Sequence, residues 1–176
     1  MKKFFLTCLS MLLLAAVNVQ AQSDRAPSPA ATVMQKVGLT DITIEYSRPS
    51  MKDRTIFAAD GLVPFGQMWR TGANAATKIT FSDAVKIGDG ELAAGSYAIL
   101  TKPGASSWDI NFYPYEASRW STYRDADPAV SIKATPKTLP NNVESFFIAV
   151  DDLRDYSASI ILRWEKTVVA FPIGVK

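Results

Sequence analysis

The stretch DITIEYS, residues 41 to 47, alternates apolar and polar side chains one for one. On an extended chain Ile42, Ile44 and Tyr46 fall on one side, and the residues between them fall on the other. Such alternation is typical of a strand that has one face on a core and one face toward water. It favours an antiparallel sheet, because strands of parallel sheets are usually apolar on both faces.

The same period of two recurs outward from this stretch, most clearly at 76–82, 107–115 and 157–165. Further strands are expected at 32–37, 96–102, 130–135, 143–150 and 168–173. Turn signals separate them, including Gly88-Asp89-Gly90, Pro140-Asn141-Asn142 and the polar corner Glu165-Lys166-Thr167. One helical turn is expected between 115 and 123. The pattern predicts an all-β fold, a single antiparallel β-sandwich of about nine strands over residues 32–176.

The N-terminus has the pattern of a secretory signal peptide. Two lysines precede an apolar run at 4–17, and small residues lead to a cleavage position near Ala21. That run is shorter than the roughly 20 residues of a membrane span, and no second run of its length follows. We expect an exported protein, periplasmic or extracellular, without a transmembrane anchor. Residues 1–21 form the signal peptide, and residues 22–31 form a flexible leader.

Composition excludes several kinds of chemistry. The sequence contains no histidine, and its one cysteine, Cys8, falls within the expected signal peptide. Disulfides, thiol catalysis, Cys/His zinc sites and Ser-His-Asp machinery are therefore excluded from the mature chain. We expect no cofactor and no metal. Without Lys2 and Lys3, 17 basic residues balance 17 acidic ones. A chain without net positive charge is a poor partner for nucleic acid.

The long connection at 47–66 is the first candidate for a binding site. It carries Arg48, Lys52 and Arg54 among prolines and glycines, and loops of this length without regular structure are functional or mobile. The planar guanidinium group offers several fixed donors to an acidic or hydroxyl-rich ligand. The alternative is that these cations pair with neighbouring acids, such as Glu45, on a solvated face.

The stretch WRTGANAAT, residues 69 to 77, is the second candidate. Because Trp69 and Arg70 are adjacent, alternation predicts that they face opposite sides, with Trp69 anchored in the core. Gly72 and Asn74 tolerate positive φ, so the chain is expected to turn there. Two interpretations remain open for Arg70: a structural ion pair in the interior, or a contact to a ligand.

Aromatic side chains form the third candidate. Tyr113 and Tyr115 share the face opposite Trp108, and Trp120 follows in a loop between arginines. Rings with polar neighbours hold sugars in many carbohydrate-binding modules, because apolar sugar faces stack on them. The alternative is that the rings pin the loop to the core.

Paired carboxylates would be needed for a glycosidase without histidine. Acids such as Asp125, Asp127, Asp151 and Asp152 are present, but they stand where loop ends are expected, and sequence spacing does not establish a catalytic distance. The typical calcium loop of alternating Asp residues is not found. A non-enzymatic protein is therefore favoured.

Several of these stretches together resemble a family catalogued as domain of unknown function 2911, common in secreted proteins of Bacteroidetes and related bacteria. The similar residues are YSRP at 46–49, KDRTIF at 52–57, LVPFG at 62–66, WRTGAN at 69–74, AT at 76–77, LAAGSYA at 92–98, WE at 164–165 and FP at 171–172. The resemblance implies a secreted β-sandwich with no established activity, so it transfers no catalytic residue to this chain.

The sequence thus favours a non-enzymatic β-sandwich that binds a small polar or carbohydrate ligand. The expected ligand-binding residues are Arg48, Arg54, Trp69, Arg70, Asn74, Tyr113, Tyr115 and Trp120. The alternative is a structural or protein-interaction module of the cell envelope. A hydrolase with paired carboxylates is the least favoured hypothesis.

Overall fold

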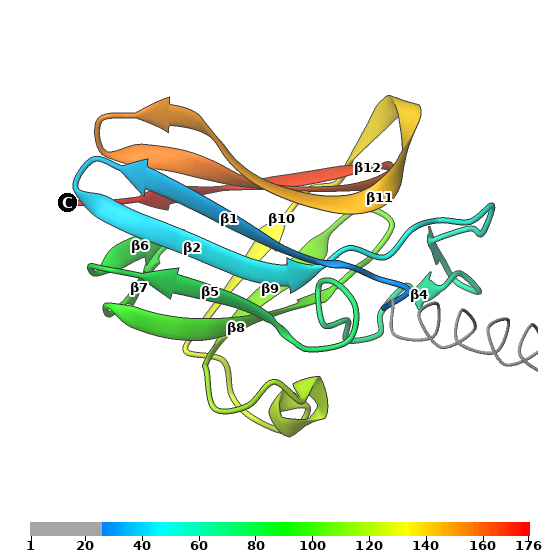
Figure 1. Ribbon diagram of the computed structural model, residues 1–176, viewed down its shortest axis with the longest axis horizontal. Helices are drawn as coiled ribbons and strands as arrows, with labels where there is room; N and C mark the ends of the chain where they lie inside the picture. The colour runs from blue at the N-terminus through cyan, green and yellow to red at the C-terminus, as the bar shows by residue number, and fades with distance from the viewer. Residues whose placement is uncertain (1–25) are drawn as a thin grey trace, which may run out of the picture.

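Residues 26–176 are described by a computed structural model, and they form two antiparallel sheets packed face to face (Figure 1). The expected signal peptide, 1–21, and the first residues of the expected leader lie outside the described residues. Helical structure in the described range is limited to one 3-10 turn, η3 (Trp120–Tyr123), which falls where a helical turn was expected.

The larger sheet has six strands in the order β1-β2-β5-β8-β9-β10, and each neighbouring pair is antiparallel. Its strands are β1 (Ala30–Val37), β2 (Thr40–Ser47), β5 (Thr77–Phe81), β8 (Gly95–Lys102), β9 (Trp108–Pro114) and β10 (Val130–Ala134). The first strand begins at Ala30, two residues before the expected start of the domain.

The smaller sheet has four strands in the order β11-β12-β6-β7. They are β6 (Val85–Ile87), β7 (Gly90–Leu92), β11 (Lys137–Arg154) and β12 (Ser157–Gly174). A separate pair of two-residue strands, β3 (Phe57–Ala58) and β4 (Val63–Pro64), lies in the long connection after β2. The prediction of an antiparallel β-sandwich is confirmed.

Alternation places the core as the sequence predicts. Ile42, Ile44 and Tyr46 of β2 are buried between the sheets, whereas Asp41 and Glu45 are exposed. The predicted inward residues of the later strands are buried as well: Ile79, Phe81, Trp108, Ile110, Phe112, Ile160, Leu162 and Trp164. Burial of such side chains contributes about 1.5–3 kcal/mol each, so this core stabilises the fold without disulfides.

Two expected turns in the second half of the chain are wrong. Glu165-Lys166-Thr167 does not separate two strands, because β12 continues through it with Glu165 at a φ of +53°. Pro140-Asn141-Asn142 lies within β11, where the register shifts between Thr138 and Val143. In both places the register between β11 and β12 shifts, so the strands are locally distorted without ending. The expected turn at Gly88-Asp89-Gly90 does join β6 and β7.

A second, smaller cluster of buried residues lies on the outer face of the larger sheet. Its members are Ala76, Ala98, Leu100, Tyr113 and Tyr123, with Met68, Tyr115 and Trp120 packed against them. The connection between β9 and β10, which contains η3, covers this face and projects from the sandwich (Figure 1). The larger sheet is therefore covered on both faces at this place.

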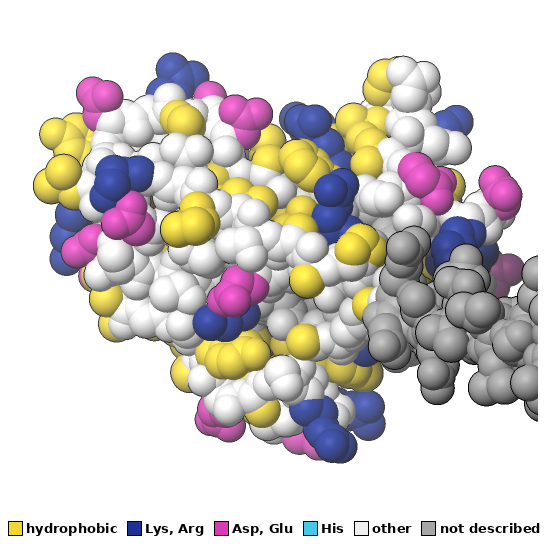
Figure 2. Space-filling model, in the orientation of Figure 1, with side chains coloured by type: hydrophobic (Ala, Val, Ile, Leu, Met, Phe, Trp, Pro, Cys, Tyr) yellow, Lys and Arg dark blue, Asp and Glu magenta, His cyan; other side chains and the backbone are white. Residues whose placement is uncertain are grey.

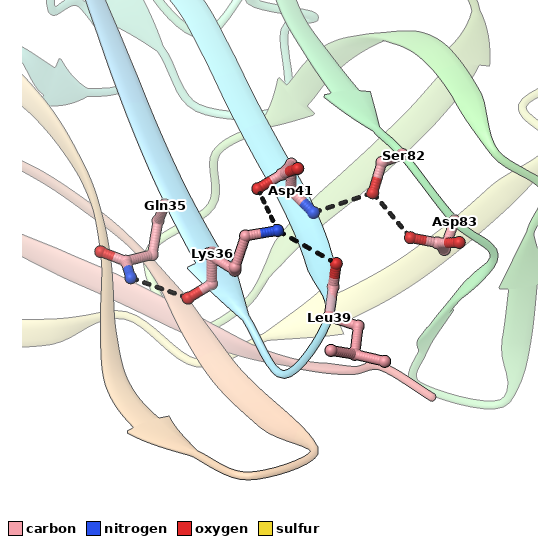
Figure 3. A network of polar contacts seen from close by, with 6 residues as sticks. All are labelled: Gln35, Lys36, Leu39, Asp41, Ser82 and Asp83. Carbon is pink, nitrogen blue, oxygen red and sulfur yellow. Dashed lines mark hydrogen bonds and ion pairs between the residues drawn. The ribbon is translucent and has the colours of Figure 1, made fainter.

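A network of polar contacts surrounds the β1–β2 turn at one end of the sandwich (Figure 3). The ammonium group of Lys36 lies 2.7 Å from Asp41 and donates to the carbonyl oxygen of Leu39. The backbone N–H of Asp41 donates to Ser82, whose hydroxyl donates to Asp83. These bonds tie the turn to the end of β5.

Candidate functional site

A pocket of about 310 Å³ opens at the end of the sandwich near β4. Five segments form its walls, namely 27–28, 49–54, 62–63, 69–73 and Trp164 of β12. The two candidate loops, at 47–66 and 69–77, thus meet at one concavity. Pockets for small molecules are commonly about 300–1,000 Å³, so this one suits a small ligand.

Stacked tryptophans form the floor of the pocket. Trp69 is only 7% exposed, and its indole N–H donates to the carbonyl oxygen of Gly72 at 2.9 Å. Its ring stacks on Trp164 and meets Phe57 and Phe146 edge to face. The prediction that Trp69 anchors the core is confirmed, and only a small part of its surface is available to a ligand.

Three cations border the pocket: Lys52, Arg54 and Arg70. Arg54 is held by backbone carbonyl groups, since its Nε donates to Met51 at 2.8 Å and its Nη2 donates to Ser50 at 2.7 Å. Arg70 donates from Nη1 to the carbonyl oxygen of Asn74 at 3.2 Å. Both guanidinium groups are therefore positioned by neutral partners.

Carboxylates pair with other cations. Within residues 26–176 the ion pairs are made by Lys36, Lys78, Lys133, Arg154 and Lys176, and none by the three cations of the pocket. Glu45, the acid considered as a partner for the cations of the long connection, lies 2.7 Å from Lys78 instead. Arg70 therefore forms no ion pair with any residue between 26 and 176. Within this range the interpretation of Arg70 as a structural ion pair is wrong.

Arg48 lies apart from the pocket lining, at the edge of the smaller sheet. Its Nε donates to the carbonyl oxygen of Phe146 at 2.9 Å, and its guanidinium lies 5.7 Å from the ring centre of Phe147. Its backbone N–H donates to Pro29. These contacts fasten the end of β2 to β11.

Asn74 supports the pocket wall and does not line it. With φ at +58° it adopts the left-handed conformation that asparagine tolerates. Its side-chain amide donates to the carbonyl oxygen of Ser28 at 3.1 Å and to the hydroxyl of Ser47 at 3.2 Å. Because Ser28 is a lining residue, Asn74 positions that part of the wall.

Trp69 and Arg70 both border the pocket, although alternation predicted that they face opposite sides. Thr71 has a φ of +54°, so the extended alternation that predicted opposite sides ends there. A β-branched residue in this region stores strain of roughly 1–3 kcal/mol. Thr71 is held by a bond from Thr77 to its carbonyl oxygen and by its own hydroxyl, which donates to Thr101.

The aromatic candidates Tyr113, Tyr115 and Trp120 lie outside the pocket lining, in the cluster on the outer face. Tyr113 is 3% exposed and packs against Tyr123. The hydroxyl of Tyr123 accepts two backbone N–H groups and donates to Ala117. These contacts agree with the alternative in which rings pin the loop.

Trp120 nevertheless connects this loop to the pocket. The guanidinium of Arg70 lies 5.4 Å from its ring centre, and that of Arg124 lies 5.3 Å from it. Both distances are within the range of cation–π attraction. Arg70 therefore borders the pocket and also contacts the connection between β9 and β10, which we call the covering loop.

One tyrosine packed against this loop, Tyr113 of β9, has a shifted pKa. Burial raises the pKa of the Tyr113 hydroxyl above its usual 10.0, and the negative charge of Asp127 raises it further. Both effects disfavour the charged phenolate. The neutral phenol form of Tyr113 is therefore favoured in the folded chain.

Two residues important to the site were not predicted from the sequence, both from β12. Trp164 completes the floor, and the carboxylate of Glu165 accepts the backbone N–H groups of Ile56 at 3.2 Å and Phe57 at 3.5 Å. Glu165 thereby holds the long connection in place. Nothing in the local pattern of β12 indicates contacts with a loop about a hundred residues earlier.

Two kinds of feature are absent from residues 26–176. This range contains no group of three or more metal-ligating side chains placed to hold an ion. None of these residues forms a helix with the length and apolar character of a membrane span.

The fold and the site together define a class: an antiparallel β-sandwich with a basic pocket on a tryptophan floor at one end. The chain belongs to a protein family of unknown function, DUF2911, whose model matches residues 28–173. The resemblance found in the sequence is thereby confirmed. Searches of curated proteins and of solved structures each found no match.

Proposed function

We propose that this protein is a non-enzymatic binding module, which holds a small polar or carbohydrate ligand in the pocket floored by Trp69. The main support is the pair of guanidinium groups, Arg54 and Arg70, fixed by backbone carbonyl groups at the edge of a defined concavity. Fixed donors beside an apolar floor orient a ligand at low entropic cost.

The predicted ligand-binding residues divide into two groups under this proposal. Arg54, Trp69 and Arg70 line the pocket and would contact the ligand. Arg48 and Asn74 would act indirectly, because they fasten the segments that carry the pocket walls. The aromatic residues of the covering loop would contribute through Trp120, which touches Arg70.

Paired-carboxylate hydrolysis has no support at this pocket. None of its lining residues is Asp or Glu, whereas that chemistry requires two carboxyl groups beside the scissile bond.

A protein-interaction module of the cell envelope is the second candidate. Apolar side chains stand exposed at the end opposite the pocket, where Leu39 is 84% and Tyr156 is 71% exposed. The two turns that carry them are adjacent, because a Cβ atom at Gly38 would lie 2.8 Å from the carbonyl oxygen of Asp155. Clustered apolar residues on a surface often mark contacts with other proteins.

Both candidates place the protein outside the cytoplasm, in the periplasm or beyond, after cleavage near Ala21. Support comes from the sequence of residues 1–21 alone. Mass spectrometry of the protein purified from cell fractions tests this, since export predicts a mature chain that begins at Gln22.

Ligand screening tests the binding proposal. Protein produced from the full sequence is applied to a glycan array and to a thermal-shift panel of small polar compounds. We expect hits that Arg70→Ala removes and that the matched change Arg154→Ala, on the β11–β12 turn, leaves intact. Absence of any hit dependent on Arg70 contradicts the proposal. Specific capture of an envelope protein that Tyr156→Ser abolishes supports the second candidate instead.

A further inference from the structure

We infer that the ligand of this pocket carries an oxyanion group, a carboxylate or a sulfate, which Arg54 and Arg70 bind. The inference rests on the proposed binding function and adds the chemical class of the ligand. Three features support it: the positive charge of the pocket lining, the unused N–H donors of Arg54 and Arg70, and the apolar floor beneath them.

The lining of the pocket is positively charged. Of the described residues that border the pocket, three are cationic and none is anionic. Four cations elsewhere, Lys36, Lys78, Lys133 and Arg154, each lie within 3.0 Å of a carboxylate. Figure 2 shows basic and acidic side chains interspersed over the visible face. The described lining of the pocket carries three positive charges without a carboxylate among them, so it attracts a negative group.

The nearest acids are directed to other partners. Glu144 accepts the backbone N–H of Lys52 at 3.1 Å, and Glu165 accepts the N–H groups of Ile56 and Phe57. Asp53 is exposed, and none of these three acids lines the pocket. Lys52, Arg54 and Arg70 thus form no ion pair with these three acids.

Arg54 and Arg70 have N–H donors that are not used within the described part of the protein. A guanidinium group has five N–H donors, and Arg54 uses two of them on carbonyl groups. Arg70 uses one. The planar fork matches carboxylate, sulfate and phosphate oxygens in pairs, which is the geometry that favours arginine over lysine at anion sites.

The floor of the pocket is apolar. Pro49, Val63, Trp69 and Trp164 are buried residues of the lining, so one side of the pocket is protein interior and not water. Charge interactions are stronger where water is partly excluded. An anion in this pocket would gain more from the two arginines than it would on an open surface.

A matched pair of ligands tests the inference by calorimetry. Tri-galacturonate carries three carboxylates, and its fully methyl-esterified form has the same sugar rings without the charges. We expect tri-galacturonate to bind at least tenfold more tightly than the ester, and more weakly as salt is added. Inorganic sulfate is titrated separately, because sulfate binding alone would assign the site to a free oxyanion and still support the inference.

Variants show whether the two arginines are responsible. Arg54→Gln and Arg70→Gln should each weaken anion binding at least tenfold, whereas Arg54→Lys, which keeps the charge but not the fork, should weaken it less. Arg154→Gln, remote from the pocket, should leave binding unchanged. Thermal unfolding of each variant checks that it is folded.

Two results would overturn the inference. If the ester binds as tightly as the acid, the ligand class is wrong, while a binding function that depends on Arg70 survives. If neither tri-galacturonate nor sulfate binds, the pocket is not an oxyanion site, and hits among neutral sugars would then decide the fate of the proposed function.

Discussion

The indole rings of Trp69 and Trp164 lie nearly parallel, with centroids 5.8 Å apart and planes 19° apart. Trp164 belongs to β12 of the smaller sheet, and Trp69 is bridged to Thr101 of β8 in the larger one. The stack therefore joins the two sheets at the base of the pocket. Stability and ligand binding meet in this one contact.

Removal of the Trp69 ring should destabilise the whole domain. Trp69→Ala deletes a buried ring in contact with three other aromatic residues besides Trp164, so we expect a loss of about 3–5 kcal/mol in the free energy of unfolding. Guanidinium chloride denaturation measures it. Trp120→Ala, at a partly exposed ring, should cost less. Equal losses for the two variants would contradict a central role of the stack.

Glu165→Ala should loosen the long connection after β2. The substitution leaves the buried N–H of Ile56 without its acceptor, at a cost of about 1–3 kcal/mol. Hydrogen exchange at Ile56 should become faster, while exchange in β9 stays unchanged. Glu91→Ala is the matched control, since Glu91 is exposed and its only ion pair is long, at 3.8 Å. An unchanged exchange rate at Ile56 would show that the carboxylate is dispensable.

Arg70→Gln should have little effect on stability. Arg70 loses its contact with Trp120, worth about 0.5–1 kcal/mol, and breaks no ion pair within the described residues. A structural ion pair in the interior would instead cost about 3–5 kcal/mol when broken. Denaturation of the variant in urea separates the two cases, and a loss in the larger range would refute the role assigned to this side chain.

Asn74→Ala should destabilise the wall that contains Ser28. Alanine at a φ of +58° costs about 1–2 kcal/mol, and the bonds to Ser28 and Ser47 are lost as well. Asn74→Gly removes the same bonds without the backbone penalty, so it should be the milder change. Thermal unfolding of both variants, with limited proteolysis at residues 26–29, measures the two contributions. The backbone explanation fails if glycine is as harmful as alanine.

Stability should fall at high pH through Tyr113. The folded chain raises the pKa of this hydroxyl above 10.0, so the unfolded chain releases the proton first as pH rises. The contribution is fully present below pH 10 and is lost as pH rises from about 10 through the folded pKa. Chemical denaturation between pH 8 and 11 should show a steeper fall for the wild type than for Tyr113→Phe. Parallel curves would remove Tyr113 as the cause.

Most of the sandwich could be predicted from alternation, because one face of each long strand is buried and the other is not. The misses have local physical causes. The distorted stretch at Glu165 has the polar composition of a turn, although the hydrogen-bonded strand continues past it. The strands β6 and β7 have three residues each, too few to show a period. The connection between β9 and β10 is held in place by the packing of Tyr123 on Tyr113, which alternation does not encode.

The site was predictable in part. Arg54, Trp69 and Arg70 were named from the sequence, because cations and a tryptophan stand out in loops rich in glycine and proline, and they do line one pocket. Trp164 was assigned to the core alone. Its second role depends on the packing of β12 beside the loop at 49–54, which no spacing in the sequence encodes.

The bridge between Ser50 and Ser145 has a further consequence for how this chain behaves among its own copies. β11 is an edge strand of 18 residues, and unpaired edges of that length recruit other strands and seed aggregation. The backbone of Pro49 and Met51 occupies part of that edge through bonds to Phe146 and Glu144. The loop that presents Lys52 and Arg54 to the pocket thus also shields the chain from edge-to-edge self-association.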